Sequence, residues 1–201
     1  FPGGPGTFEE LLYLIGIKLN PANKEAQLPL FLTGPKESED YFKTIDRFIG
    51  EIFGAEAQAL YEIIIDDPEK IARKVSIEMK EIKKSRLQSS DSYGFNWGLK
   101  IEADFQQPFE PTHQNMSNLD LHLEQSKESL AANLRRVFSG IVAGNIKPDT
   151  IEQVEKHGPF QLHGDPILME KIDRVLQDFV DQHRMKLPGG EAYQPCYRII
   201  K

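Results

Sequence analysis

The first ten residues hold the residue types and spacing that are best suited to chemistry. They read FPGGPGTFEE, with three glycines and two prolines, and the apolar run Leu11–Leu19 follows directly. Glycine allows a tight turn and a close approach to a ligand, and a helix that begins at about Thr7 would add unpaired N–H groups at its positive end. The stretch therefore predicts an anion site, most often for phosphate. Its donors would be the N–H groups of Gly3, Gly4, Gly6 and Thr7.

Glu10, the last residue of this stretch, has two interpretations. Thr7-x-x-Glu10 fits a capping box, in which the hydroxyl and the carboxylate satisfy backbone N–H groups at the start of a helix. In the other interpretation, Glu10 is a carboxylate held about one helical turn from a bound phosphate, where it acts on the sugar that carries this phosphate. The spacing alone leaves both open.

The motif and several longer stretches together resemble one enzyme family. Residues Pro2–Glu10 match the PGGxGTxxE signature of the LOG ("Lonely Guy") phosphoribohydrolases, long mislabelled as lysine decarboxylases. Four further stretches are similar to a longer bacterial branch of that family: Glu9–Leu14, Asn20–Lys24, Leu32–Ser38 and His183–Gly189. The resemblance runs through essentially the whole chain, so the motif indicates the superfamily and the tail indicates the branch.

The resemblance implies an activity and assigns roles to residues. Enzymes of this branch hydrolyse the N-glycosidic bond of a nucleoside 5′-monophosphate, which releases the free base and ribose 5-phosphate. Glu10 is then the catalytic residue, and the glycine loop with Thr7 holds the 5′-phosphate. The resemblance implies no cofactor, a cytoplasmic location and a homo-oligomer, either a dimer or a tetramer. It also implies an arginine and base-contacting residues upstream of Phe1, so we expect this chain to have little activity by itself.

A cluster of basic residues marks the end of an expected helix. Its members are Lys80, Lys83, Lys84 and Arg86. Cations at a helix C-terminus interact favourably with the helix dipole, so an exposed helix end is one interpretation. The other is an anion site, because the branch that this chain resembles is regulated by the alarmone (p)ppGpp; Lys83 and Arg86 are then the candidate contacts. A non-catalytic protein that binds a nucleotide or the alarmone is the alternative to an enzyme.

The composition excludes several other classes of protein. The chain of 201 residues has a formal net charge of −7 and a pI near 5.3, which argues against a general nucleic-acid binder. Cys196 is its one cysteine and cannot form an internal disulfide, as suits a reducing compartment. No apolar run approaches the roughly 20 residues of a membrane-spanning helix. The five histidines show no HxxxH or HExxH spacing, so we expect no metal site.

The hydrophobic pattern predicts an α/β fold for residues 1–90. Leu28–Thr33 and Tyr61–Ile65 are short apolar runs bounded by turn residues, which is typical of buried parallel strands. Helices are expected from Thr7 to Asn20, between the strands, and from Asp66 to Arg86. This order is the second half of a Rossmann-like, doubly wound sheet. Two strands do not make a stable open sheet, and the chain begins with Phe1, so we expect further strands upstream.

Residues 91–201 are predicted to form a mainly helical C-terminal domain. Apolar stripes at helical spacing run from Leu130 to Ile141 and from Leu168 to Val180. Phe160–His163 and Tyr197–Ile200 could be minor strands. The aromatic stretch Tyr93–Gly98 is either a base-stacking platform or, as we favour, a segment that docks this domain on the α/β half.

Overall fold

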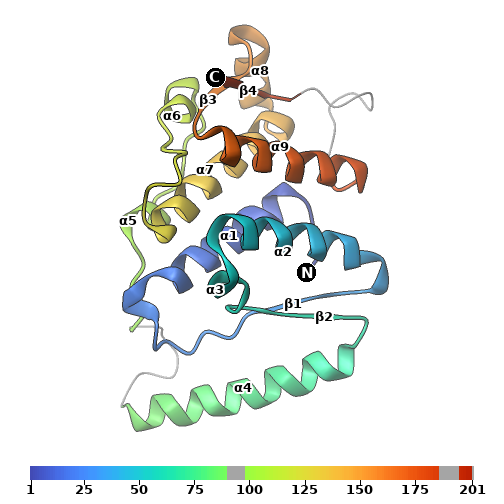
Figure 1. Ribbon diagram of the computed structural model, residues 1–201, viewed down its shortest axis with the longest axis vertical. Helices are drawn as coiled ribbons and strands as arrows, with labels where there is room; N and C mark the ends of the chain where they lie inside the picture. Colours follow the sequence, from blue (N-terminus) through green and yellow to red (C-terminus); the bar gives the residue numbers. More distant parts are fainter. Residues whose placement is uncertain (90–97, 186–194, 201) are drawn as a thin grey trace. The chain divides into compact units, whose positions relative to one another are not determined.

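The computed structural model describes residues 1–89, 98–185 and 195–200 of the chain. Residues 93–97 of the aromatic stretch lie outside the described residues, so neither interpretation of that stretch is tested. The chain divides into two compact units. The first unit contains Phe1–Pro2 and Ile17–Glu102, and the second contains Gly3–Gly16 and Ala103–Lys201. Helix α1 (Pro5–Leu19), labelled in Figure 1, contributes residues up to Gly16 to the second unit and its last residues, from Ile17, to the first.

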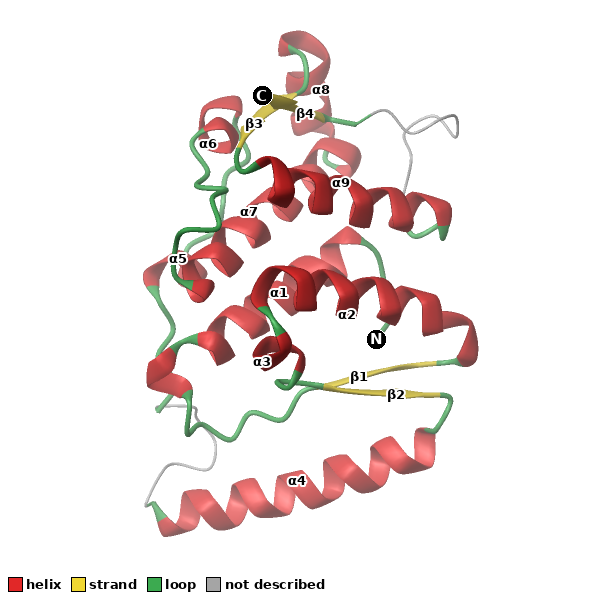
Figure 2. Ribbon diagram, in the orientation of Figure 1, coloured by secondary structure: helices red, strands yellow, loops and turns green. Residues whose placement is uncertain are grey.

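The first unit is built around two parallel strands, as the sequence predicts. Strands β1 (Phe31–Gly34) and β2 (Glu62–Ile65) pair in parallel, with Leu32 opposite Ile63. Helices α2 and α4 lie on opposite sides of this pair (Figure 2). The other elements of the unit complete the connections. The unit contains η1 (Pro21–Asn23), η2 (Lys36–Ser38), α2 (Glu39–Phe53), α3 (Ala55–Gln58) and α4 (Pro68–Gln88).

The two long helices of this unit are packed very differently. Helix α2 buries one apolar face that includes Phe42, Ile45 and Ile49, each at most 2% exposed. Helix α4 is capped by Asp67, whose carboxylate accepts a hydrogen bond from the Lys70 N–H, and none of the residues of α4 is fully buried. The pairs that Glu62 of β2 forms with Lys70 and Lys74 link α4 to the sheet. Among the described residues of the first unit, α2 therefore contributes much more to the buried core than α4 does.

Asparagine side chains define the end of α1 and the segment that follows. The Asn20 side chain accepts a hydrogen bond from the Ala22 N–H at 2.9 Å and so caps η1. Asn23 is 4% exposed, and its amide donates to the carbonyls of Ile17 and Lys100 at 2.7 Å each. The Lys100 N–H donates back to Asn23 Oδ1, also at 2.7 Å. A buried amide with satisfied partners thus ties residue 100 to the end of α1.

The second unit is mainly helical, as the sequence predicts, around a core shared by three helices. Phe8 of α1 makes edge-to-face contacts with Phe138 and Phe179, at centroid distances of 4.9 and 6.0 Å. All three rings are fully buried, so they supply a large part of the apolar area that holds α1 against α7 and α9. The elements of this unit after α1 are α5 (Ala103–Gln106), α6 (His113–Ser117), α7 (Lys127–Ile146), α8 (Pro148–His157), β3 (Phe160–His163), α9 (Pro166–Asp181) and β4 (Tyr197–Ile200).

The two minor strands expected in the C-terminal half are present and pair with each other. Strands β3 and β4 form a parallel pair in which Phe160 lies opposite Tyr197. Phe160 and Leu162 are fully buried, whereas Gln161 and His163 are exposed. The alternation places one face of this pair on the core. The doubly wound sheet expected for residues 1–90 is reached only as far as the parallel pair β1–β2, and a domain boundary at residues 90 and 91 stays a prediction.

The expected start of the first helix is wrong by two residues. The Phe8 N–H donates to the Gly4 carbonyl at 3.1 Å, which makes Gly4 the residue before the helix and Pro5 its first member. Proline suits this position, because its fixed φ is helical and the N–H that it lacks would have no acceptor within the helix.

Among the described residues, none of the helices is both long and apolar enough to cross a membrane.

Candidate functional site

The first turn of α1 carries the backbone donors that the sequence predicts for an anion. Gly6 and Thr7 occupy this turn, where N–H groups have no acceptor within the helix and the dipole is positive. Gly3 and Gly4 lead directly into it. The four proposed donors are therefore consecutive around the start of one helix, except for Pro5, which has no N–H to offer. This arrangement suits a phosphate group.

The three glycines of the motif have different steric environments. A Cβ at Gly3 would lie 2.1 Å from Thr7 Oγ1, so the Thr7 side chain lies over Gly3. A Cβ at Gly4 would lie 2.1 Å from the backbone oxygen of Arg184. At Gly6 the nearest atom would be Val142 Cγ2 at 3.8 Å, an ordinary contact. Gly4 is thus the position where close backbone packing most strictly requires glycine, because a backbone oxygen cannot swing away as a side chain can.

The capping-box interpretation of Thr7 and Glu10 is wrong. Because the helix begins at Pro5, Thr7 is its third residue and cannot be its N-cap. Glu10 is exposed, and it lies three residues after Thr7 and four after Gly6. Side chains at these spacings share one face of a helix. The Glu10 carboxylate therefore lies one turn beyond the first-turn N–H groups, on the same face, as a group acting on a phosphorylated sugar would need.

Glu9 is a second carboxylate of the motif, and the sequence alone gives it no role. It lies 3.9 Å from the Arg135 guanidinium and accepts a hydrogen bond from Ser139. Burial raises the pKa of the Glu9 carboxyl above its usual value, and the Ser139 hydrogen bond and the Arg135 charge oppose this shift. Arg135 also stacks over the Tyr13 ring, 5.8 Å from its centroid. The two adjacent glutamates thus differ: Glu9 anchors α1 to α7, and Glu10 is exposed.

No local signal in the sequence identifies the Glu9 partners. Arg135 and Ser139 are separated from Glu9 by more than a hundred residues, and only the docking of α1 on α7 brings them together. The spacing of Glu9 and Tyr13 is the one hint, since it places both on the same helix face. The Arg135 side chain is only 13% exposed, because this docking covers it.

In the first unit, a cavity lies beside the carboxyl end of β2 and the segment that follows β1. Pro2 packs against Gly34, the last residue of β1, where a Cβ would lie 3.0 Å from the proline ring. Asp66 follows β2 with a left-handed φ of 56°. Ligands of open parallel sheets bind outside the carboxyl ends of the strands. The cavity here measures about 720 Å³ and is lined by Lys36, Glu39, Phe42, Lys43, Asp46, Ile63, Ile65, Asp66 and Asp67.

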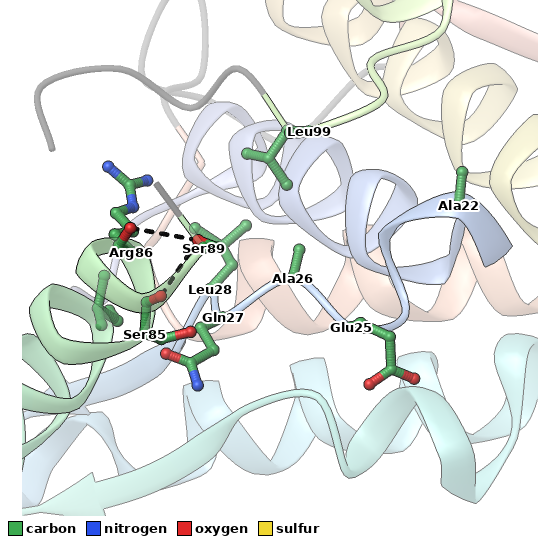
Figure 3. A pocket seen from close by; sticks show the side chains of 11 residues that line it. Ala22, Glu25, Ala26, Gln27, Leu28, Ser85, Arg86, Ser89 and Leu99 are labelled. Atoms are coloured by element: carbon green, nitrogen blue, oxygen red, sulfur yellow. Dashed lines mark hydrogen bonds between the residues drawn. The ribbon is translucent and has the colours of Figure 1, made fainter. Parts of the chain in front are cut away.

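The basic cluster at the end of α4 does not converge on one cavity. Arg86 lines a cavity of about 330 Å³ together with Ser85 and Ser89, which face the segment from Glu25 to Leu28 (Figure 3). The Ser89 hydroxyl donates to the backbone carbonyls of Ser85 and Arg86 at 3.1 and 3.3 Å. Lys83 lines a different hollow of about 390 Å³, with Lys80, Lys84, Leu87 and Gln88. The two candidate effector contacts therefore lie on one helix but border separate cavities.

The described residues contain no group of three or more His, Cys, Asp or Glu arranged to hold a metal ion. Cys196 is 4% exposed, and burial raises the pKa of its thiol to about 12. The Asn145 amide lies 3.6 Å from its sulfur. A thiol with this pKa is protonated near neutral pH and is a poor nucleophile. Glu10 is thus the better supported candidate for chemistry.

Comparison with known proteins adds two family matches and close relatives. The family described as "Pyrimidine/purine nucleotide monophosphate nucleosidase, C-terminal" matches residues 79–200, and that described as "Possible lysine decarboxylase" matches residues 1–75. The chain is 54% identical over 199 residues to the pyrimidine/purine nucleotide 5′-monophosphate nucleosidase of Escherichia coli (strain K12), and equally to that of Escherichia coli O157:H7. Each alignment covers 99% of this chain and 44% of the relative. The chain therefore spans less than half the length of these relatives.

Proposed function

Because the chain belongs to the pyrimidine/purine nucleotide monophosphate nucleosidase C-terminal family, we propose that it carries part of the active site of a nucleotide nucleosidase. The substrate is a nucleoside 5′-monophosphate. Water attacks C1′ of the ribose, the C1′–N bond breaks, and the products are the free base and ribose 5-phosphate. The observation that carries this proposal is the placement of Glu10 one turn beyond the N–H groups of Gly6 and Thr7, on the same helix face.

The residues divide the work between binding and chemistry. The N–H groups of Gly3, Gly4, Gly6 and Thr7 hold the 5′-phosphate at the positive end of α1. Glu10 stabilises the positive charge that develops at C1′ as the bond breaks, or takes a proton from the attacking water. The proton leaves with the departing base. A phosphate held one turn from Glu10 fixes the sugar within reach of the carboxylate, which is the advantage of positioning.

Replacement of Glu10 by glutamine in the full-length protein tests this role. Loss of the carboxylate should lower kcat for purine and pyrimidine monophosphates by about 10²–10⁴, the usual contribution of a positioned acid–base group. Thermal stability should change little, because Glu10 is exposed and takes no part in a capping box. The matched control is Glu56→Gln on α3, which removes another exposed carboxylate. Release of base at the parental rate by Glu10→Gln would contradict the catalytic role.

The remaining features of the proposal concern the fold and regulation of the whole protein. We propose that β1 and β2 belong to a Rossmann-like doubly wound sheet, in a cytoplasmic homo-oligomer, a dimer or a tetramer.

The cavity beside Arg86 and the hollow beside Lys83 offer two places where basic side chains could meet the phosphates of (p)ppGpp. Calorimetry with AMP, GMP and (p)ppGpp, run beside an assay for released base, tests this. Binding without base release would favour the alternative, a non-catalytic nucleotide or alarmone sensor.

A further inference from the structure

The turn that ends α9 approaches the glycine motif more closely than a side chain would allow. The backbone oxygen of Arg184 lies where a Cβ at Gly4 would need to be, 2.1 Å from the ideal Cβ position. Gly4 is the residue before α1, and its carbonyl accepts the first hydrogen bond of that helix from Phe8. Arg184 is more than a hundred and seventy residues away in sequence, yet both residues belong to the same compact unit.

A single left-handed residue gives this turn its shape. His183 has φ 55°, a conformation that residues other than glycine rarely adopt. Its N–H donates to the Val180 carbonyl at 2.9 Å, and the Arg184 N–H donates to the Phe179 carbonyl at 2.7 Å. These bonds end α9 in the way that a left-handed residue ends many helices. The reversal at His183 comes directly before Arg184, whose carbonyl lies against Gly4.

The contact between the turn and the motif is part of a closed circuit of interactions. The Phe8 N–H is bonded to the Gly4 carbonyl, and the Phe8 ring packs against the Phe179 ring in the buried core. The Phe179 carbonyl accepts the Arg184 N–H, and the Arg184 carbonyl returns to Gly4. Each residue of the circuit is therefore fixed from two sides. Such a circuit holds the backbone of Gly4 in one position before any ligand arrives, which is what precise anion binding by N–H groups requires.

We propose that His183 is a positioning residue for the phosphate site of the motif. It acts through the Arg184 carbonyl on Gly4 and so aims the N–H groups at the start of α1. This inference rests on the proposed function for the identity of the ligand, a phosphorylated sugar, but not for the geometry of the turn. The role is one of the backbone: glycine or asparagine, which adopt left-handed φ readily, should replace His183, and a β-branched residue should not.

The test compares recognition of the phosphate with recognition of the rest of the substrate. Val, Gly and Asn are introduced at position 183 of the full-length protein, and kcat and KM are measured for a nucleoside 5′-monophosphate and for the same nucleoside without phosphate. His183→Val should lower kcat/KM for the nucleotide about tenfold and leave kcat/KM for the nucleoside without phosphate within about twofold, so the preference for the phosphorylated substrate should fall about tenfold. His183→Gly and His183→Asn should behave as the parent does. His183→Ala replaces His183→Val if the latter does not fold.

A matched control separates positioning from a general loss of stability. Gly158 also has a positive φ, 82°, and ends α8 in the same unit. A Cβ there would meet no atom within 4 Å, so Gly158→Val strains a turn away from the motif. If Gly158→Val lowers the phosphate preference as much as His183→Val, or if His183→Val keeps the parental preference, the inference is overturned.

Calorimetry with ribose 5-phosphate and ribose makes the outcome independent of the reaction. The parent should bind ribose 5-phosphate, and His183→Val should bind it about tenfold more weakly. A parent that binds ribose 5-phosphate but releases no base contradicts the proposed function alone, and a tenfold weaker affinity in His183→Val then still supports the inference. Equal affinities of the parent and His183→Val for ribose 5-phosphate would overturn the inference alone.

Discussion

The glycine motif and the end of α4 are both candidate sites for phosphate groups, but they are built in opposite ways. The motif offers backbone N–H groups at a helix start whose core residue, Phe8, is fully buried. The end of α4 offers the side chains of Lys83 and Arg86, on a helix without a fully buried residue. Backbone donors fixed by packing bind an anion with little loss of entropy, whereas long basic side chains must be ordered when the ligand binds.

This difference suits the two roles proposed for them. A catalytic site needs its phosphate anchor fixed relative to Glu10, and the packing of α1 on α7 and α9 provides this. An effector site can use adaptable cations, because charge attracts the phosphates without demanding one geometry. We therefore expect the effect of a substitution on phosphate binding to depend strongly on its exact position in the motif, and less strongly on its position at the end of α4.

The largest contrast is expected within the motif itself, between Gly4 and Gly6. Gly4→Ala places a methyl group 2.1 Å from the Arg184 oxygen, so the turn or the helix start must move. We expect a loss of about 1–3 kcal/mol of unfolding free energy, together with weaker binding of ribose 5-phosphate. Gly6→Ala meets Val142 at 3.8 Å and should raise stability by up to about 1 kcal/mol, through helix propensity. Urea unfolding of both variants measures this; equal losses would mean that the close contact at Gly4 does not decide the cost.

The next effect is expected at the end of α4, on the affinity for the proposed effector. Arg86→Ala should weaken (p)ppGpp binding by about 1.5–3 kcal/mol, which corresponds to roughly tenfold or more, as for loss of a charge-assisted hydrogen bond. Lys83→Ala should have an additional effect only if the ligand reaches both cavities, because the two residues line different ones. Calorimetry measures the affinities. The control is Arg73→Ala, which removes an exposed cation near the other end of α4. If Arg73→Ala weakens binding as much as Arg86→Ala does, the effect is one of general charge attraction and not of a site at Arg86.

The smallest effect concerns Glu9, the half-buried carboxylate of the motif. The pKa of Glu9 is raised in the folded state, so the folded protein binds a proton there more strongly than the unfolded chain does. The contribution of Glu9 to the unfolding free energy should therefore be most favourable below pH 4.5 and should fall as the pH rises through the raised pKa. Glu9→Gln should flatten this part of the profile, which lies above pH 4.5. Urea titrations across that range measure how the unfolding free energy changes with pH, and Glu10→Gln is the exposed control. The assignment would be contradicted if Glu9→Gln kept the parental pH dependence, as the control is expected to.

Local patterns predicted the elements of this protein well where a single periodic signal decides them. The apolar runs ending at Thr33 and Ile65 became the parallel strands β1 and β2, and the brief runs Phe160–His163 and Tyr197–Ile200 became β3 and β4. The start of α1 was predicted less well. Thr7 has the stronger N-cap preference, but the turn at Gly4 and the proline that follows begin the helix earlier.

Contacts between distant residues could not be predicted, because no local pattern encodes them. The amide of Asn23 pairs with the backbone of Lys100, and Arg135 approaches Glu9. Each of these contacts follows from how whole helices dock, and docking depends on the summed packing of many side chains. The separation of Lys83 and Arg86 into two cavities is of the same kind: they are three residues apart in sequence, yet they border different hollows.

By itself, the sequence determined the residue types that can do the chemistry and their order along the chain: a glycine-rich anion loop, a carboxylate one turn further, and an acidic composition. Tertiary structure alone decided what each residue of the motif contacts. It placed the Arg184 carbonyl against Gly4, left Gly6 room for a side chain in ordinary contact with Val142, and turned Glu9 toward α7 while Glu10 stayed exposed. The physical reason is that donor types are properties of single residues, whereas steric exclusion and burial arise only when segments far apart in the chain are packed together.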